Sequence, residues 1–138
     1  MVDGESIRIL LVDDSADLRG LLELLLRDVS EVTVVGSLEN ANRLLESIES
    51  LEPHVVIMDL SMPGKSPFAA LSASREKFPA VHFLVSSSFD DEGQIDRAFD
   101  AGASGYLVKD GDIDKLLRAI QSVVRGEHPI LRDGSQPD

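Results

Sequence analysis

The sequence contains no cysteine and no tryptophan, and aromatic residues make up only 4% of its 138 residues. Without cysteine the chain can form no disulfide and no thiolate metal site, and it has no thiol nucleophile. This composition fits a reducing compartment, in which thiols are kept reduced and disulfides are rare.

Long hydrophobic runs are also missing. No apolar run reaches the roughly 18 residues that a membrane span requires. The first ten residues, MVDGESIRIL, lack the basic stretch and the long apolar stretch of a secretory signal. We therefore expect a cytoplasmic protein with no membrane partner, and the 43% hydrophobic content predicts one globular domain.

Basic residues are outnumbered, with 13 Lys and Arg against 25 Asp and Glu, so the net charge is −12. Nucleic-acid binders neutralise phosphates with Lys and Arg, so the sequence predicts no nucleic-acid contact through this chain itself. The acidic balance favours a cation as a partner, either a metal ion or a protein.

Short apolar runs rich in Val, Ile and Leu alternate with segments of helical spacing. Near-continuous runs of this kind are typical of strands that are covered on both faces. The predicted strands span 7–13, 32–36, 54–59, 81–86 and 105–109. The predicted helices span 18–29 with Ser15 as N-cap, 41–51, 68–77, 95–99 and 113–124.

This alternation predicts an α/β fold: a flavodoxin-like (βα)5, doubly wound parallel sheet with strand order 2-1-3-4-5. Five strands are too few to close a barrel. The domain is expected to span residues 6–126. Residues 127–138 show no period, and we expect a loose C-terminal tail or the start of a linker.

Polar residues stand at the carboxyl ends of four of the five predicted strands. The first strand ends in Asp13 and Asp14, the third in Asp59, the fourth in Ser86 to Ser88 and the fifth in Lys109. The second strand ends in the apolar pair Val35 and Gly36. Because right-handed crossovers bring the carboxyl ends to one edge, the polar side chains are expected to converge there.

Carboxylates that share a pocket repel one another unless a cation is present. A set of oxygen ligands without cysteine favours a hard cation such as Mg²⁺. A carboxylate can also attack phosphorus as a nucleophile, while Mg²⁺ and lysine neutralise the transferred charge. The residues therefore favour phosphoryl transfer to a carboxylate.

The motifs ILLVDDS, VVIMDLSMPG and GASGYLVKD, in this order and spacing, resemble the receiver domain of two-component response regulators. The resemblance covers residues 6–126, and the form YLVKD is most like receivers of the NarL/LuxR type. It implies a signalling switch, not an enzyme, that takes a phosphoryl group from a sensor histidine kinase or a phosphotransfer protein.

The resemblance also implies roles for single residues. Asp59 matches the phosphoacceptor. Asp13 and Asp14 match the acidic pair that holds Mg²⁺ together with Asp59, and Ser61 matches the residue whose backbone carbonyl completes the metal shell. Lys109 matches the lysine that pairs with the carboxylate and then with the phosphoryl group.

Further positions concern the switch and access to it. Ser87 matches the hydroxyl that binds the phosphoryl oxygen, and Tyr106 matches the aromatic side chain that changes rotamer. Ser88 takes the following small-residue position. Phe89 is expected to modulate the access of the water that attacks the phosphoryl group.

Several positions depart from the family pattern. Ser66 and Pro67 replace the usual Asp-Gly before the third helix, where proline is tolerated in a first helical turn. Asp110 stands where the family has a cis proline. A cis bond before a residue other than proline costs about 3 kcal/mol, so the Lys109–Asp110 bond is expected to be trans, or cis under strain.

Several alternatives remain open on the sequence alone. Asp13 or Asp14 could simply cap the first helix. An aspartyl-nucleophile phosphatase would need D-x-D at the first strand, but Ser15 stands two residues after Asp13. The three histidines are scattered along the chain and are not expected to be ligands or phosphodonors.

The output of the switch is open as well. The chain is either the receiver of a transcription regulator with a C-terminal helix-turn-helix domain, or a stand-alone single-domain regulator that acts by protein contacts. A homodimer is compatible with both. A degenerate receiver that only binds partners is disfavoured by the complete set of Asp13, Asp14, Asp59, Ser87 and Lys109.

Overall fold

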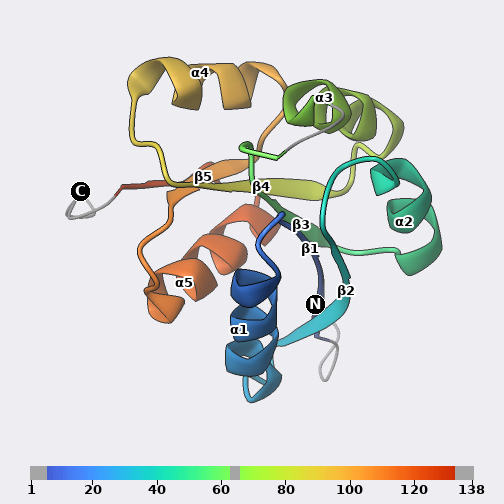
Figure 1. The fold of residues 1–138 in the computed structure, drawn as a ribbon, viewed down its shortest axis with the longest axis vertical. Coiled ribbons are helices and arrows are strands. Elements are labelled where there is room, and N and C mark those ends of the chain that lie inside the picture. Colours follow the sequence, from blue (N-terminus) through green and yellow to red (C-terminus); the bar gives the residue numbers. More distant parts are fainter. Residues whose placement is uncertain (1–5, 63–65, 133–138) are drawn as a thin grey trace.

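The fold was obtained as a computed structural model, which describes residues 6–62 and 66–132. Helices and strands alternate along the chain until a short last strand (Figure 1). The elements are β1 (Ile7–Val12), α1 (Ala16–Arg27), β2 (Val32–Leu38), α2 (Leu44–Leu51), β3 (Val55–Met58), α3 (Pro67–Lys77), β4 (His82–Ser87), α4 (Glu92–Asp100), β5 (Gly105–Val108), α5 (Ile113–Val124) and β6 (Ile130–Leu131).

The strands form one six-stranded sheet in the order β2-β1-β3-β4-β5-β6, and every neighbouring pair is parallel. Helices α1 and α5 cover one face, while α2, α3 and α4 cover the other (Figure 1). The predicted α/β, doubly wound, flavodoxin-like fold is therefore confirmed, with one strand more than expected.

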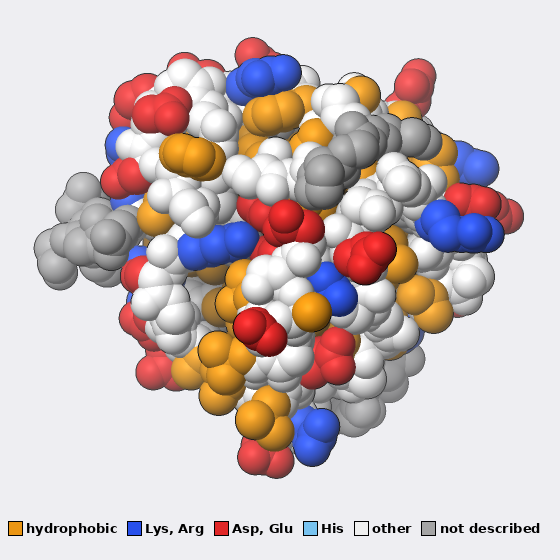
Figure 2. All heavy atoms as spheres, in the orientation of Figure 1, with side chains coloured by type: hydrophobic (Ala, Val, Ile, Leu, Met, Phe, Trp, Pro, Cys, Tyr) orange, Lys and Arg blue, Asp and Glu red, His pale blue; other side chains and the backbone are white. Residues whose placement is uncertain are grey.

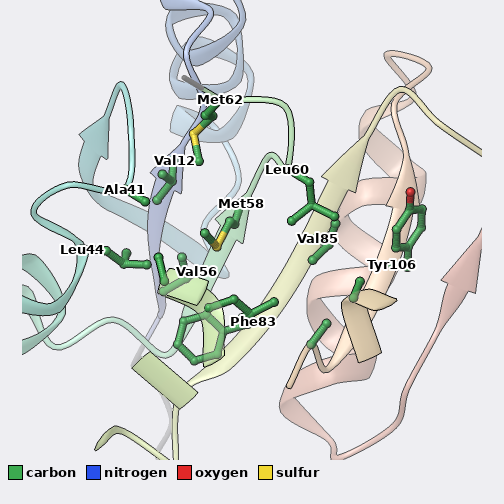
Figure 3. Packing of buried hydrophobic residues seen from close by; sticks show 14 of the residues in the cluster. Val12, Ala41, Leu44, Val56, Met58, Leu60, Met62, Phe83, Val85 and Tyr106 are labelled. Atoms are coloured by element: carbon green, nitrogen blue, oxygen red, sulfur yellow. The ribbon is translucent and has the colours of Figure 1, made fainter. Parts of the chain in front are cut away.

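The central strand β3 explains the continuous apolar runs. Val55 and Ile57 pack into the cluster under α1 and α5. Val56 and Met58 point into the other cluster, beside Phe83 (Figure 3). Because successive side chains alternate between two covered faces, every residue of this strand is buried, and no polar residue is tolerated before Asp59.

Side-chain caps set the starts of the helices. The Ser15 Oγ accepts a hydrogen bond from the Leu18 N–H at 3.1 Å, as expected for the N-cap of α1. Ser66 caps α3 in the same way, and Pro67 takes the first helical position, where its missing N–H costs nothing. The unusual Ser-Pro pair is thus a helix start, whereas Pro63 and Gly64 of the preceding motif lie outside the described residues.

Some element boundaries differ from those expected. β2 continues past Gly36 to Leu38, and its register on β1 shifts between Ile9 and Leu10. α2 begins only at Leu44. α4 begins three residues before Ile95, because the side chain of its N-cap Asp91 accepts from the Gln94 N–H at 2.7 Å. The spacing of apolar residues does not reveal a polar N-cap, so the start of α4 could not be predicted from it.

The expectation of a loose tail is wrong for Ile130–Leu131. These residues form β6, which pairs in parallel with Tyr106 and Leu107 of β5. A two-residue strand is too short to show any period, so only its pairing partner reveals it. The proposed limits of the domain and of the linker stay predictions. None of the helices in the described ranges is long and apolar enough to cross a membrane.

Candidate functional site

Two carboxylates lie side by side at the carboxyl edge of the sheet. Asp13 follows β1, and its N–H donates to the carbonyl oxygen of Leu38 at 3.0 Å. Asp59 follows β3, and its N–H donates to the carbonyl oxygen of Val12 at 2.9 Å. The sheet thus continues one residue past each strand. It holds both side chains in the interior, with exposures of 6% and 4%.

Lys109, which follows β5, supplies the positive charge between these carboxylates. Its Nζ lies 2.8 Å from Asp13 Oδ2 and 3.5 Å from Asp59 Oδ1. Acidic side chains gather near the middle of the face seen in Figure 2, with basic side chains beside them. The predicted convergence of Asp13, Asp59 and Lys109 is therefore present in the structure.

Both carboxylates also accept a hydrogen bond from nearby main chain. The Ser15 N–H donates to Asp13 Oδ1 at 2.9 Å, and the Ser61 N–H donates to Asp59 Oδ1 at 3.2 Å. The N-cap of α1 is Ser15 and not either aspartate. Asp13 is thus oriented by the turn that leads into α1, and its other oxygen remains for Lys109.

The electrostatic surroundings distinguish Asp59. Burial raises the pKa of its carboxyl above the ordinary value of 3.8, and the charge of Asp13 adds to this effect. The charge of Lys109 and the Ser61 N–H oppose it. The ionised form of Asp59 therefore depends on nearby positive charge, so a cation at the site would stabilise it.

The same carboxylates could hold a metal ion. Asp13, Asp14 and Asp59 each offer an oxygen, and these oxygens lie within 4.8 Å of one another. Asp14 is exposed, so one side of the group is open to solvent. Carboxylate oxygens of this kind suit a hard divalent cation.

Ser87 is fully buried at the end of β4 and lies in a different network. Its Oγ accepts from the Phe89 N–H at 3.1 Å and from Gln94 Nε2 at 3.0 Å. Its carbonyl oxygen accepts from the Lys109 N–H at 2.7 Å. Ser87 is therefore joined to the acidic site through the main chain of Lys109.

Tyr106 belongs to the network of Ser87. Its ring is buried, its OH donates to the carbonyl oxygen of Phe89 at 2.7 Å, and Gln94 Nε2 lies 3.4 Å from this OH. In Figure 3 the ring of Tyr106 lies beside β4 and β5. The phenol and the buried hydroxyl thus share two neighbours, the amide of Gln94 and the main chain of Phe89.

The structure adds two residues that the sequence reasoning missed. Gln94 bridges Ser87 and Tyr106, and the Arg19 side chain donates to the carbonyl oxygen of Asp13. Neither belongs to a motif, although a polar residue in the first turn of α4 was a usable hint. Ser88 and Phe89 are exposed beyond the end of β4, and Phe89 is about half exposed at 51%.

Asp110 takes the place that the resemblance assigns to a cis proline. No cis peptide bond occurs in residues 6–62 and 66–132, so the Lys109–Asp110 bond is trans. The Asp110 carboxylate bonds to the ammonium group of Lys115 on α5. The position therefore acts as an ion-pairing site next to Lys109.

Comparisons with known proteins agree with this geometry. The family model described as the response regulator receiver domain matches residues 9–121. The nitrate/nitrite response regulator protein NarL of Escherichia coli is 35% identical over 127 residues, which are 92% of this chain and 59% of NarL. The uncharacterized transcriptional regulatory protein YvfU of Bacillus subtilis is 37% identical over 88% of this chain and 60% of its own length.

Solved structures give the same result. A LuxR-family two-component response regulator from Aurantimonas superimposes with a TM-score of 0.86 at 29% identity, covering 94% of this chain and 92% of that chain. The signal receiver domain of the response regulator NarL from Mycobacterium tuberculosis gives 0.83 at 27% identity, covering 89% and 99%. The chain spans about three fifths of the length of the curated relatives named above.

Proposed function

This chain belongs to the family of response regulator receiver domains, and we propose that it accepts a phosphoryl group on Asp59 and switches conformation in response. The observation that carries the proposal is the position of Lys109 Nζ, 2.8 Å from Asp13 and 3.5 Å from Asp59 at the carboxyl edge of the sheet. One buried carboxylate is thus held beside a fixed ammonium group, which suits the negative charge of a phosphoryl group.

In the proposed reaction, an oxygen of Asp59 forms the new bond to phosphorus while the bond from phosphorus to the donor nitrogen or oxygen breaks. Lys109 stabilises the charge on the phosphoryl oxygens. Asp13 holds Lys109 in place through their contact at 2.8 Å. The Ser61 N–H also holds the Asp59 carboxylate, by donating to its Oδ1.

Mg²⁺ is the proposed cofactor, because Asp13, Asp14 and Asp59 offer oxygens within 4.8 Å of one another. These carboxylates and the backbone carbonyl of Ser61 would hold the ion. When bound, it supplies charge neutralisation for the carboxylate and the phosphoryl oxygens.

The proposed switch uses residues beside the site. The hydroxyl of Ser87 donates a hydrogen bond to a phosphoryl oxygen. Tyr106 responds through Gln94, which contacts both Ser87 and Tyr106. Ser88 and Phe89 stand at the exposed end of this loop, where the ring of Phe89 limits the approach of water to the phosphoryl group. The acceptance of the group is stoichiometric, so the protein acts as a switch and not as an enzyme with turnover.

A protein donor is supported by an apolar surface next to Lys109. Leu21 and Leu25 of α1 are exposed and line a pocket that also includes Lys109 and Ile113. Exposed apolar surface beside a charged site is typical of a protein-binding surface. We propose a sensor histidine kinase or a phosphotransfer protein as the cytoplasmic partner.

The output is proposed from the relatives. They include a transcriptional regulatory protein, YvfU, of which this chain covers 60%. Control of transcription through a helix-turn-helix domain outside this chain is therefore the first candidate. A stand-alone regulator that acts through protein contacts, as a monomer or a homodimer, is the second.

Acetyl phosphate, or beryllofluoride with Mg²⁺, tests the proposal. We expect either reagent to shift the backbone amide resonances around Asp59, Ser87 and Lys109. Acetyl phosphate should also add one phosphoryl group to the intact mass. Asp59→Asn should abolish both responses, whereas Asp28→Asn at the exposed end of α1 should keep them. An unchanged spectrum of the wild-type protein would refute the proposal.

A second experiment, with an aryl phosphate as substrate, separates the switch from a phosphatase. A phosphatase with an aspartyl nucleophile would release many equivalents of phosphate from an aryl phosphate. The proposed receiver instead takes up one equivalent from a small phosphodonor and then loses it by hydrolysis. Steady release from aryl phosphates that depends on Asp59 would favour the enzyme.

A further inference from the structure

Residues 127–132, called here the C-terminal strand segment, run alongside β5, from Ser104 just before this strand to Leu107 near its carboxyl end. The Tyr106 N–H donates to the carbonyl oxygen of Pro129 at 2.9 Å. His128 Nδ1 lies 2.9 Å from the carbonyl oxygen of Ser104. Ile130 then pairs with Tyr106 itself. The segment is therefore attached to the strand that carries the proposed switching tyrosine.

A first tie joins this segment to the loop that follows β4. The Arg132 Nη1 lies 2.7 Å from Glu92 Oε2, and its Nε bonds to the Asp90 carboxylate. Its Nη2 also donates to the carbonyl oxygen of Asp90 at 3.2 Å. The same loop begins at Ser87, so the guanidinium group holds the residues that follow the phosphoryl-binding hydroxyl.

A second tie joins the segment to the loop that follows β5. Lys115 of α5 is buried, with 8% exposure, and its Nζ donates to the carbonyl oxygen of Arg132 at 3.2 Å. The same Nζ bonds to the carboxylate of Asp110, the neighbour of Lys109, and this bond lowers the pKa of Asp110. Lys115 thus connects the C-terminal strand segment to the loop that begins at Lys109.

From these contacts we infer that the C-terminal strand segment is a readout element: a phosphoryl group on Asp59 tightens its attachment to β5 and to the loops after β4 and β5. The inference rests on the proposed function of Asp59. It adds a route by which the state of the acidic site reaches the C-terminal end of the described chain.

The direction follows from the bonds of Ser87. The Oγ of Ser87 accepts hydrogen bonds from the Phe89 N–H and from Gln94. Its own O–H can therefore donate a hydrogen bond to a phosphoryl oxygen while both of these bonds remain. The added bond restricts the loop from Ser87 to Glu92. Arg132 then loses less entropy when it binds an already ordered loop, and its attachment becomes stronger.

Hydrogen exchange of the 138-residue chain, followed by mass spectrometry, tests the inference. Beryllofluoride with Mg²⁺ should slow the exchange of residues 127–132 in the wild-type protein by about fivefold, the scale of a partly exposed ion pair. In Arg132→Gln this slowing should fall below about twofold, while the loops after β4 and β5 remain protected by the ligand. Because linkage is reciprocal, this variant should also bind beryllofluoride about two- to threefold more weakly.

Arg125→Gln is the matched control, since Arg125 lies just before the segment and pairs with its first residue, Glu127, in an exposed ion pair. It should respond like the wild type. Unchanged or faster exchange of residues 127–132, together with protected loops, overturns the inference and leaves the proposed function intact. If the ligand protects no part of the wild-type protein, the proposed function fails instead.

Discussion

Titratable residues of neighbouring strands lie close together at both ends of the sheet, but the electrostatic result differs between the two ends. At the carboxyl end, Asp13 and Asp59 are like charges around Lys109, and burial raises the pKa of Asp59. At the amino end, His54 and His82 lie beside each other, since the His82 N–H donates to the carbonyl oxygen of His54 at 3.0 Å.

The surroundings of His82 favour its neutral form. Burial lowers the pKa of His82, and the charges of Arg75, His54 and His128 lower it further. His54 Nδ1 accepts from the Arg8 N–H at 2.9 Å, which a neutral ring can do. The amino end therefore resolves its electrostatics within the chain, whereas the carboxyl end keeps a charge that an incoming cation or phosphoryl group can change.

The largest expected effect is at Lys109. Lys109→Met leaves Asp13 and Asp59 without their shared counter-charge, so we expect the free energy of unfolding to fall by about 1–3 kcal/mol. Mg²⁺ should stabilise this variant, because a cation at the carboxylates replaces the missing charge. Urea unfolding with and without Mg²⁺ measures both effects.

Lys77→Met serves as the control for this substitution. Lys77 is exposed, and its ion pair with Glu49 is long, at 3.9 Å, and open to solvent. Its loss should therefore change the free energy of unfolding by less than about 0.5 kcal/mol. Equal effects of the two substitutions would show that Lys109 carries no special electrostatic role.

A second, smaller effect is expected at Asp59. Because its pKa is higher in the folded protein than the ordinary 3.8, the folded state takes up the proton first as the pH falls. The cost of the buried charge is thus fully present above the folded pKa and shrinks as the pH falls towards 3.8. Asp59→Asn removes the charge, so the variant should be more stable than the wild type at pH 7, by on the order of 1 kcal/mol.

The pH dependence of this difference is the informative measurement. Thermal unfolding of both proteins between pH 7 and pH 4 should show the advantage of Asp59→Asn decreasing with pH. Asp28→Asn, on an exposed carboxyl, serves as the control for the loss of one negative charge. A constant difference at every pH would contradict the assignment of the raised pKa to Asp59.

The smallest effect is expected at His82, at the other end of the sheet. Its folded pKa lies below the unfolded value of 6.5, so the unfolded chain binds the proton first, and stability falls as the pH drops through 6.5 towards the folded pKa. His82→Gln should flatten this decline between pH 8 and pH 5 by less than about 1 kcal/mol in urea unfolding. The response to beryllofluoride should stay unchanged, because the acidic site lies at the opposite end.

Much of the carboxyl end was predictable because it depends on local sequence. An apolar run that ends in a single aspartate specifies both a doubly covered strand and the position of its carboxylate, as at Val55–Met58 and Asp59. Once the order of the strands follows from right-handed crossovers, Asp13, Asp59 and Lys109 must meet. The helix start at Ser15 follows from the same local chemistry.

The tertiary structure alone determined the contacts between distant polar residues, because these residues belong to no motif and to no apolar repeat. Gln94 bridges Ser87 and Tyr106, and Lys115 and Arg132 tie β6 to both loops, yet no spacing in the sequence marks these partners. The adjacency of His54 and His82 likewise depends on the register of β3 on β4. Periodicity determines which face of an element is buried, whereas a single polar contact between distant residues depends on where the packed elements place the side chains.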